Sequence, residues 1–352
     1  MNKAHNIYVH TPFCASKCNY CAFFSRACAN PDWDEFTNKI VQETRYWGQK
    51  LGKITVPTIF FGGGTPSLIP TVFFNKIICE ISRNFNFAPN IEITLEANPG
   101  TLSAEKLDEF CKIGVNRLSI GVQSLDDEKL KFLGRRHSVK DARGLIESAS
   151  QKNIRVSADF IYGLPGQSVD EVITLCRDIN SLGLTHCSLY ELTIEKNTPF
   201  GKMNLVMPDN KTMADMYLAI QDNLDLPRYE VSNYAKSGFE CKHNQNVWDG
   251  EPYIGIGQGA AGRVFINDVW YEQMGNHEKF ETLSPQERAI EKILTGMRTM
   301  RGTELTDDVR AVINMEFAKS EKNMLGFTND NRIFATNAGI LVLDDLITKL
   351  VK

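Results

Sequence analysis

Three cysteines lie within eight residues near the start of the chain, in the segment HTPFCASKCNYCAFFS. They follow the spacing Cys14-x3-Cys18-x2-Cys21. A structural zinc site normally takes four protein ligands, so three thiols are one ligand short. A [4Fe–4S] cluster can be held by three thiolates, which leaves its fourth iron open to another molecule. The spacing therefore favours an iron–sulfur cluster; the alternatives are a zinc site completed by a distant histidine and three unrelated core cysteines.

The composition is that of an ordinary globular protein. Of 352 residues, 42% are hydrophobic and 23% are charged, and the formal net charge of −4 shows no basic bias toward nucleic acid. The other six cysteines lack motif spacing, which fits a reducing compartment better than a disulfide framework; they are Cys28, Cys79, Cys111, Cys176, Cys187 and Cys241. No apolar span of 18 residues and no signal-peptide core occur. We therefore expect a cytoplasmic protein without a transmembrane segment or nucleic-acid partner, whose contact with a membrane surface is an open question.

Short β-branched and aromatic runs alternate with stretches of helical periodicity. The strand candidates are residues 7–9, 58–61, 91–96, 117–120, 155–161 and 186–192. In the stretch 33–51, apolar residues recur near helical spacing between Pro31 and Gly52. Six strands joined by helical crossovers predict a parallel sheet.

Several of these strands are followed at once by residues that could do chemistry. GGGTP follows Phe61, EANP begins at Glu96, GVQS follows Ile120, and DFIYGLPGQ begins at Asp159. In a (β/α) barrel the active site lies at the carboxyl ends of the strands, so this placement favours a barrel-like α/β fold with one shared site over an open doubly wound sheet. After about residue 200 the pattern changes: residues 201–212 are expected to form a loop and residues 213–224 a helix. Residues 1–282 are expected to form the main domain, and residues 283–352, helix-rich with one short strand at 332–335, a small appended domain.

Each block also has a physical interpretation. The glycines of GGGTP allow positive φ and close backbone approach, which suits either ligand capture by backbone groups or a tight turn. Glu96 could hold an ammonium or hydroxyl group, or form an ordinary salt bridge. Gln123 and Asp159 occupy matching strand ends. Arg135 is a candidate partner for a carboxylate, with a solvated helix end as the alternative.

The segment GIGQGAAG fits the GxGxxG pattern of dinucleotide-binding proteins. In those proteins the motif opens a helix, whereas the residues that follow here, RVFINDVWYEQ, are typical of a strand. Dinucleotide binding is therefore not expected.

The segment CASKCNYC is similar to the CxxxCxxC signature of the radical SAM superfamily, whose open iron binds the amino and carboxylate groups of S-adenosylmethionine. Further blocks fall in the order found in the oxygen-independent coproporphyrinogen III oxidase-like family. They are YVHTPFCASKCNYCAF, FFGGGTPS, EANPG, LSIGVQSL, LGRRH, DFIYGLPGQ and YELTIEKNTPF. The resemblance covers roughly residues 5–262.

The resemblance implies a fold, cofactors and site residues. The fold would be a partial (β/α)6, TIM-like radical SAM barrel with a small, mainly helical C-terminal domain. The [4Fe–4S] cluster would be held by Cys14, Cys18 and Cys21. The residues implied to contact S-adenosylmethionine are Tyr8, Tyr20, Gly63, Gly64, Thr65, Glu96, Gln123, Arg135, Asp159 and Glu191.

Two features distinguish the branches of this family. By this resemblance, the oxidases are longer chains that have an N-terminal extension and a fourth cysteine two residues after the third. In this chain thirteen residues precede Cys14, and the residue two after Cys21 is Phe23. In both features the chain resembles the HemW-type heme chaperone branch, whose signature is CxxxCxxCxF. That branch also carries HNxxYW, and this chain reads CKHNQNVW, with Val247 in place of tyrosine. His243 is thus a candidate heme ligand, because neutral imidazole binds heme iron, although Ala261 stands where the family often has histidine.

The resemblance favours a heme chaperone, with heme as cargo, a recipient protein as partner and dimerisation as an open property. The alternative is an oxygen-independent coproporphyrinogen III oxidase. In that enzyme the reduced cluster would cleave S-adenosylmethionine to a radical that drives decarboxylation of propionate side chains. A radical SAM tRNA-modifying enzyme is a more distant alternative, disfavoured by the acidic balance.

Overall fold

The computed structural model describes residues 3–275 and 277–352. Its centre is one curved sheet that has eleven strands in the described residues, in the order β13-β12-β11-β10-β1-β4-β5-β6-β7-β8-β9. The six strands predicted from the sequence are neighbours in this order and run parallel, which confirms the predicted sheet. They are β1 (Asn6–Thr11), β4 (Thr55–Gly63), β5 (Asn86–Ala97), β6 (Arg117–Gln123), β7 (Arg155–Tyr162) and β8 (His186–Glu191).

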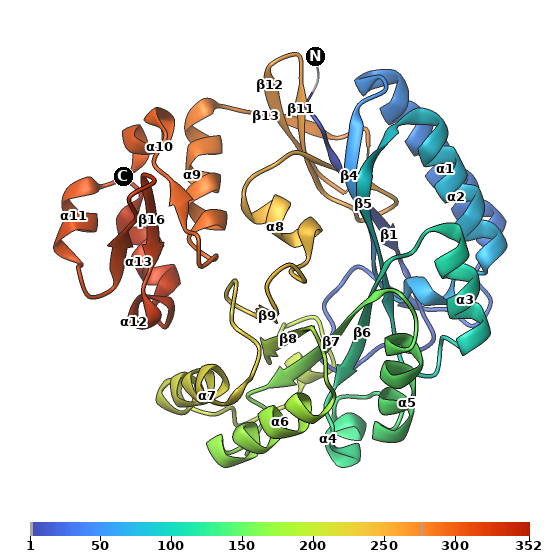
Figure 1. Ribbon diagram of the computed structural model, residues 1–352, viewed down its shortest axis with the longest axis horizontal. Helices are drawn as coiled ribbons and strands as arrows, with labels where there is room; N and C mark the ends of the chain where they lie inside the picture. Colours follow the sequence, from blue (N-terminus) through green and yellow to red (C-terminus); the bar gives the residue numbers. More distant parts are fainter. Residues whose placement is uncertain (1–2, 276) are drawn as a thin grey trace.

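Helices on the outer face of the curved sheet connect these strands, as in a partial barrel (Figure 1). Helix α1 (Trp33–Leu51) has the predicted bounds. It begins directly after Asp32, whose side chain accepts a backbone N–H of the first turn, and it ends before Gly52, whose φ is 71°. Its apolar stripe, which includes Ile40 and Trp47, is buried. The other outer helices are α2 (Thr71–Asn84), α3 (Ala104–Ile113), α4 (Asp127–Phe132), α5 (Val139–Ser150), α6 (Val169–Ser181) and α7 (Asn210–Asn223).

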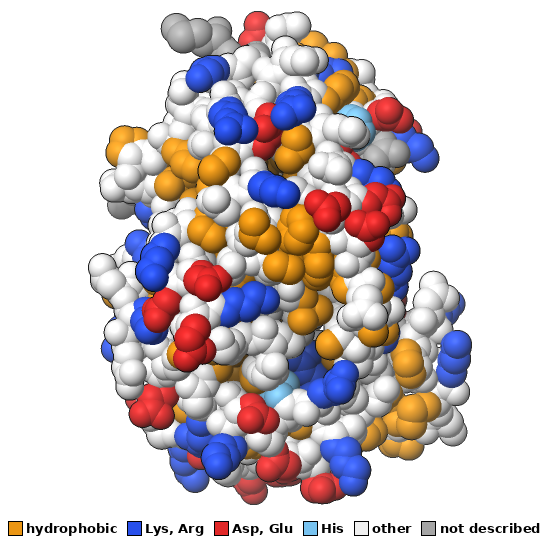
Figure 2. Space-filling view, turned by 90° about the vertical axis from the view of Figure 1, so that its right-hand side faces the viewer, with side chains coloured by type: hydrophobic (Ala, Val, Ile, Leu, Met, Phe, Trp, Pro, Cys, Tyr) orange, Lys and Arg blue, Asp and Glu red, His pale blue; other side chains and the backbone are white. Residues whose placement is uncertain are grey.

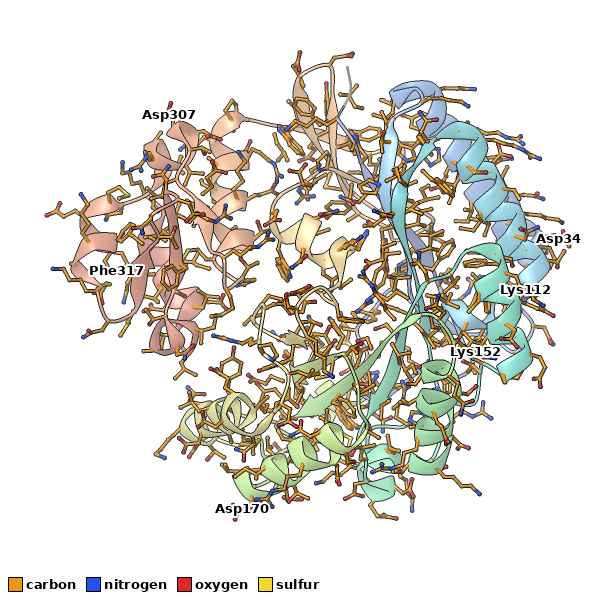
Figure 3. All side chains as sticks on the ribbon, in the orientation of Figure 1. Asp34, Lys112, Lys152, Asp170, Asp307 and Phe317 are labelled. Atoms are coloured by element: carbon orange, nitrogen blue, oxygen red, sulfur yellow. The ribbon has the colours of Figure 1, made fainter. Side chains whose placement is uncertain are left out.

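Charged side chains cover the outer helices. Figure 3 shows Asp34 on α1, Lys112 on α3 and Asp170 on α6 projecting away from the sheet. Figure 2, which looks onto the right-hand side of Figure 1, shows acidic and basic side chains interspersed around groups of hydrophobic ones. This mixture is typical of the solvent-facing sides of amphipathic helices. Within the part of the chain that the structure describes, no helix has the length and apolar character needed to cross a membrane.

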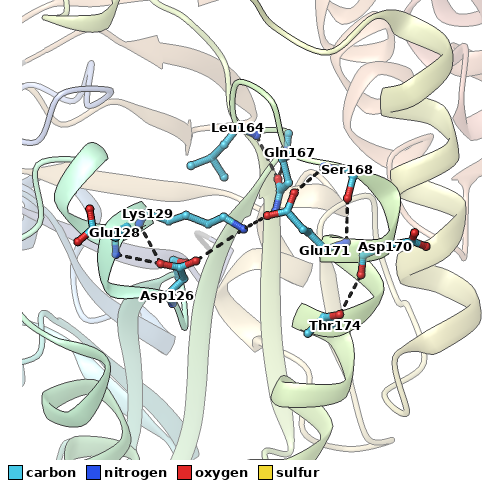
Figure 4. Close-up of polar contacts among 11 residues, drawn as sticks. Asp126, Glu128, Lys129, Leu164, Gln167, Ser168, Asp170, Glu171 and Thr174 are labelled. Atoms are coloured by element: carbon cyan, nitrogen blue, oxygen red, sulfur yellow. Dashed lines mark hydrogen bonds and ion pairs between the residues drawn. The ribbon is translucent and has the colours of Figure 1, made fainter.

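Polar contacts join α4 to α6 and close the turn after β7 (Figure 4). The Lys129 ammonium lies 2.7 Å from a carboxylate oxygen of Glu171 and 4.0 Å from one of Asp126. Gln167 accepts the backbone N–H of Gly163 at 2.8 Å, so the GLPGQ turn is held by its own side chain. These contacts stabilise the loop that follows β7 at the carboxyl end of the parallel strands.

The sheet extends beyond the six predicted strands at both edges. β9 (Asn233–Ala235) pairs antiparallel with β8, and β10 (Tyr253–Ile256) pairs parallel with β1. β11 (Gly262–Ile266), β12 (Val269–Gln273) and β13 (Phe280–Leu283) continue from β10 as an antiparallel meander. The strand character predicted for RVFINDVWYEQ is therefore confirmed, but this segment forms two strands, β11 and β12, with a turn at Asn267 and Asp268. The sequence does not predict β9 or β10, because three or four residues show too little alternation.

The predicted loop at residues 201–212 is wrong at its end. Helix α7 begins at residue 210, where Asp209 caps it by accepting the N–H of Thr212. A short 3-10 helix also occurs at Phe200–Lys202. The prediction placed the helix start at the first strongly apolar residue, whereas the cap sets it about one turn earlier.

The last part of the chain packs around a second hydrophobic core, which includes Ile293, Met297, Val309, Ile333 and Leu346. Its elements are α9 (Pro285–Gly296), β14 (Thr303–Glu304), α10 (Asp307–Val312), α11 (Met315–Ser320), β15 (Leu325–Phe327), β16 (Arg332–Ala335), α12 (Asn337–Ile340) and α13 (Leu343–Leu350). The predicted strand 332–335 is confirmed as β16, the centre of a small sheet that also contains β14 and β15. The domain division at residue 283 stays a prediction.

Candidate functional site

A cavity of about 400 Å³ lies at the carboxyl ends of the parallel strands. Because parallel strands end at the same edge, the fold brings residues far apart in the sequence to this one place. The predicted site residues that line it are Cys14, Cys18, Cys21, Tyr20, Gly63, Gly64, Thr65, Glu96, Gln123, Arg135, Asp159 and Glu191. Tyr8 and His243 are not among the described residues of its lining.

The loop that carries the three cysteines is held by backbone hydrogen bonds. β2 (Phe13–Cys14) pairs with β3 (Arg26–Ala27), and the Cys28 N–H donates to the Cys14 carbonyl at 2.9 Å. Asn19 ties the middle of the loop to the backbone at the end of α4. In residues 3–275 and 277–352, no three His, Cys, Asp or Glu side chains are grouped as for a single metal ion. All three thiols lie on the cavity wall, and an iron–sulfur cluster would bind each through a different iron.

The GGGTP turn packs directly on the cysteine loop. Gly63 has a φ of 105°, and a Cβ at Gly64 would lie 2.5 Å from the Phe13 carbonyl oxygen, so both positions require glycine. The N–H groups of Gly63 and Gly64 donate to the Glu96 carboxylate at 3.2 Å and to the Thr11 carbonyl at 2.7 Å. The close backbone approach predicted from the sequence is present, but these two N–H groups bind the protein's own chain.

Two carboxyl groups face the cavity from the ends of β5 and β7, the strands on either side of β6. Burial, and to a smaller extent the charge of Asp159, raise the pKa of Glu96 to about 8. Burial also raises the pKa of Asp159, against the effect of hydrogen bonds from Ser188 at 2.7 Å and Ser119 at 3.0 Å. A positively charged ligand would stabilise both carboxylates, so this wall of the cavity suits a cation.

The substitution Glu96→Gln should remove part of the pH dependence of folding stability in the cofactor-free protein. The pKa of Glu96 in the folded state, about 8, lies above its ordinary value of 4.5, so the folded protein holds a proton that the unfolded chain has released. The contribution of Glu96 to folding stability should therefore be complete below pH 4.5 and should be lost as the pH rises from 4.5 through 8. Because the side chain lines an open cavity, we expect roughly 1 kcal/mol per pH unit. Urea unfolding of the wild-type protein and of Glu96→Gln at pH 6.5 and 8.0 measures this difference. An equal change in unfolding free energy between the two pH values in both proteins would contradict the prediction.

Arg135 joins the cysteine loop to the strand ends. One terminal nitrogen lies 3.3 Å from the Cys18 sulfur, and the other donates to the Asn98 side-chain oxygen at 2.5 Å and to the Gly121 carbonyl at 2.7 Å. Its Nε is buried without a hydrogen-bond partner. An unpaired buried donor is costly, so this guanidinium suits a ligand with an anionic group.

The backbone at Gln123 is in the left-handed region, with a φ of 69°, which is uncommon for a residue other than glycine. An irregularity in the pairing of β6 with β7 lies between Gly121 and Gln123. Such local strain is typical of functional sites. Burial raises the pKa of the Tyr20 hydroxyl and of the Glu191 carboxyl on the same cavity wall.

Tyr8 reaches the site indirectly, through His10, a histidine that no motif in the sequence singles out. Its hydroxyl lies 3.0 Å from Nδ1 of His10, and Nε2 of His10 donates to the Phe24 carbonyl at 2.7 Å. Tyr8 and His10 therefore support the cysteine loop through the backbone of Phe24, which follows the third cysteine. The sequence signal for His10 was its place in YVHTPFC, and for Asn98 its place in EANP, but neither pattern indicates a partner.

His243 lies on the short helix α8 (Lys242–Trp248), away from the cavity, and is 6% exposed. Its Nδ1 is 2.7 Å from the Thr58 hydroxyl, and its ring centre lies 5.1 Å from that of Phe60. Burial, and to a smaller extent the charge of Arg117, lower the pKa of His243 to about 3. The ring is thus neutral near pH 7, the state in which imidazole binds metals.

Comparisons with known proteins agree on one group. Residues 8–179 match the sequence profile of the Radical SAM superfamily. The chain is 38% identical over 268 residues to heme chaperone HemW of Escherichia coli (strain K12), covering 75% of this chain and 71% of the relative. It is 36% identical over 266 residues to heme chaperone HemW of Bacillus subtilis (strain 168), covering 73% and 70%. The solved structure of coproporphyrinogen III oxidase (HemN) from Escherichia coli has a TM-score of 0.81 at 17% identity, covering 99% of this chain and 90% of that one, and so shares the fold.

Proposed function

This chain belongs to the radical SAM superfamily and, within it, to the heme chaperone HemW family, and from that premise we propose that it binds heme and transfers it to a recipient protein. The observation that carries the proposal is 38% identity to a heme chaperone along 75% of the chain, whereas the similarity to the oxidase is one of fold. Phe23 adds support, because it stands where an oxidase is expected to have a fourth cysteine. It lies on the cavity wall and is 66% exposed.

We assign the [4Fe–4S] cluster to Cys14, Cys18 and Cys21, the three thiols on the cavity wall. When bound, the cluster leaves one iron for the amino and carboxylate groups of S-adenosylmethionine. The backbone contacts of the cysteine loop hold the thiols in place before any ligand arrives.

The cavity residues fit S-adenosylmethionine, which carries a sulfonium, an ammonium and a carboxylate. Glu96 and Asp159 supply negative charge for the cationic groups, and the unpartnered Nε of Arg135 suits the carboxylate. Ile161 and Leu192 supply apolar lining for the adenine. The remaining proposed contacts are Tyr20, Gly63, Gly64, Thr65, Gln123 and Glu191. For Tyr8 the proposal is an indirect role through His10.

We assign the axial heme ligand to His243. Helix α8 lies between the sheet and the C-terminal part. The two residues directly after it contact the C-terminal part: the Arg301 guanidinium pairs with Asp249 at 2.6 Å, and the Arg288 guanidinium donates to the Gly250 carbonyl. At 6% exposure, and with its ring against Thr58 and Phe60, His243 can meet heme only after a rearrangement that uncovers the ring.

Replacing the proposed ligand, as His243→Ala, should weaken heme binding at least about tenfold and shift the Soret band, because iron loses a nitrogen ligand. The measurement is an absorbance titration of the purified protein with heme. His186→Gln is the matched control, since His186 is equally buried but its two ring nitrogens already contact Ser157 and Tyr229. An unchanged affinity and Soret band in His243→Ala would remove His243 from the heme site.

The carrier proposal includes a cytoplasmic location, a separate small domain at residues 283–352 and a recipient protein for the heme. It leaves room for a dimer, which size measurement with and without the cluster would detect. The function itself is tested by loading the protein with one equivalent of heme and mixing it with apomyoglobin as a generic acceptor. Transfer faster than the release of heme to buffer supports a carrier, and retention of heme or its uncatalysed loss contradicts one.

A further inference from the structure

A buried chain of hydrogen bonds ends at His243 and sets the protonation of its ring. The Asn6 side-chain nitrogen donates to the Pro252 carbonyl at 3.1 Å. Because a carbonyl oxygen can only accept, this contact identifies the nitrogen end of the Asn6 amide. The Asn6 side-chain oxygen must then face the other way, where it accepts from the Thr58 hydroxyl at 2.8 Å. Asn246, on α8 itself, donates to the same oxygen at 2.8 Å.

A hydroxyl has one proton, and Thr58 gives it to Asn6. The contact of 2.7 Å between the Thr58 oxygen and Nδ1 of His243 therefore requires that Nδ1 carries the proton and donates it. In a neutral imidazole the lone pair then lies on Nε2. This arrangement, with Nδ1–H given to an oxygen and Nε2 left as the acceptor, is the one that metal-binding histidines use.

A second buried contact fixes the helix that carries His243. Glu92 on β5 is 3% exposed, and its carboxylate accepts the N–H groups of His243 at 3.0 Å and Lys242 at 3.2 Å. The residue before helix α8 is Cys241, whose side chain makes no capping hydrogen bond, so Glu92 caps the helix from about 150 residues away. The charge of Glu92 is balanced by Arg155 at 3.5 Å and by the nearby buried Arg117.

We propose that Thr58 and Glu92 are positioning residues for the heme ligand: Thr58 keeps the lone pair of His243 on Nε2, and Glu92 holds the start of its helix. This inference rests on the proposed function. His186 on β8 provides a contrast, because its Nδ1 contacts the Ser157 hydroxyl and its Nε2 contacts the Tyr229 hydroxyl, which leaves no nitrogen for a metal.

The test uses the full chain with histidine labelled in its ring nitrogens. Two-bond proton–nitrogen correlation spectra show which nitrogen is protonated, and the His243 signal is identified by its loss in His243→Ala. Wild type is expected to carry the proton on Nδ1. Thr58→Val, which removes the acceptor at nearly constant volume, should mix the two tautomers and weaken heme binding roughly 10- to 100-fold. Thr58→Ser should restore both properties.

The control is Thr94→Val, the same change at a fully buried strand position whose hydroxyl has no hydrogen-bond partner. It should leave the tautomer and the heme affinity unchanged. For Glu92→Gln, faster exchange of the amide protons of residues 242 and 243 is expected. A proton on Nε2 in wild type, or an unchanged tautomer in Thr58→Val, would overturn the inference, and if Thr58→Val does not fold the wild-type and Thr58→Ser spectra decide it. If the tautomer shifts as expected but neither Thr58→Val nor His243→Ala alters heme binding, the positioning stands and heme ligation by His243 fails.

Discussion

Cys18→Ser is expected to abolish the broad absorption near roughly 400 nm that a [4Fe–4S] centre would give, with matching loss of bound iron and sulfide. A serine hydroxyl is a much poorer iron ligand than a thiolate, and two remaining thiolates cannot hold a cubane stably. The fold should survive, because the cysteine loop is fixed by backbone contacts and Cys18 is only partly buried. The measurement is anaerobic reconstitution followed by absorbance and iron analysis, with far-ultraviolet circular dichroism as the check on folding.

Cys28→Ser is the matched control for this experiment. Cys28 closes the same loop through its backbone N–H, yet its side chain does not line the cavity among the described residues. The control should retain wild-type iron and sulfide content. Equal cluster content in Cys18→Ser and wild type, or equal loss in Cys28→Ser, would contradict the assignment of the three cavity thiols.

Arg135→Lys is expected to weaken binding of S-adenosylmethionine about 10- to 100-fold while leaving the cluster in place. The guanidinium makes three contacts at once, to the Cys18 sulfur, the Asn98 side chain and the Gly121 carbonyl, and keeps Nε for a ligand. A lysine ammonium keeps the charge but lacks this planar fork. Charged hydrogen bonds are worth about 1.5–3 kcal/mol, which corresponds to the expected loss of affinity. Equilibrium binding to the reconstituted protein measures it.

Arg136→Lys provides the comparison, because Arg136 has the same side chain, is exposed and does not line the main cavity. It should bind S-adenosylmethionine as wild type does. Equal affinities in Arg135→Lys and Arg136→Lys would exclude Arg135 from the cofactor site.

The parts of the fold that could be predicted from the sequence are those with strong local patterns. Helix α1 has its cap, its apolar stripe and its terminal glycine within one continuous segment, and its bounds are predicted correctly. The six parallel strands are apolar runs long enough to show their periodicity. The short strands β9 and β10 lack such a pattern and exist because β8 and β1 offer them free edges.

The same distinction applies to the site. Cysteine spacing and strand-end position were sufficient to select Cys14, Cys18, Cys21, Glu96, Gln123 and Asp159, which all line the cavity, whereas Tyr20 and Glu191 came from the family resemblance. Supporting residues such as His10, Asn98 and Glu92 were missed, because each acts through a partner that is distant in sequence or has no motif of its own. The buried position of His243 could not be predicted either, since it depends on how α8 packs between the sheet and the C-terminal part.

The most direct test of the heme-carrier account is one anaerobic experiment on the reconstituted, reduced protein with S-adenosylmethionine. The same sample is assayed for consumption of coproporphyrinogen III and titrated with heme. The account predicts stoichiometric heme binding with a defined Soret band and no conversion of coproporphyrinogen. Conversion to protoporphyrinogen without specific heme binding would contradict it and identify the chain as an oxidase.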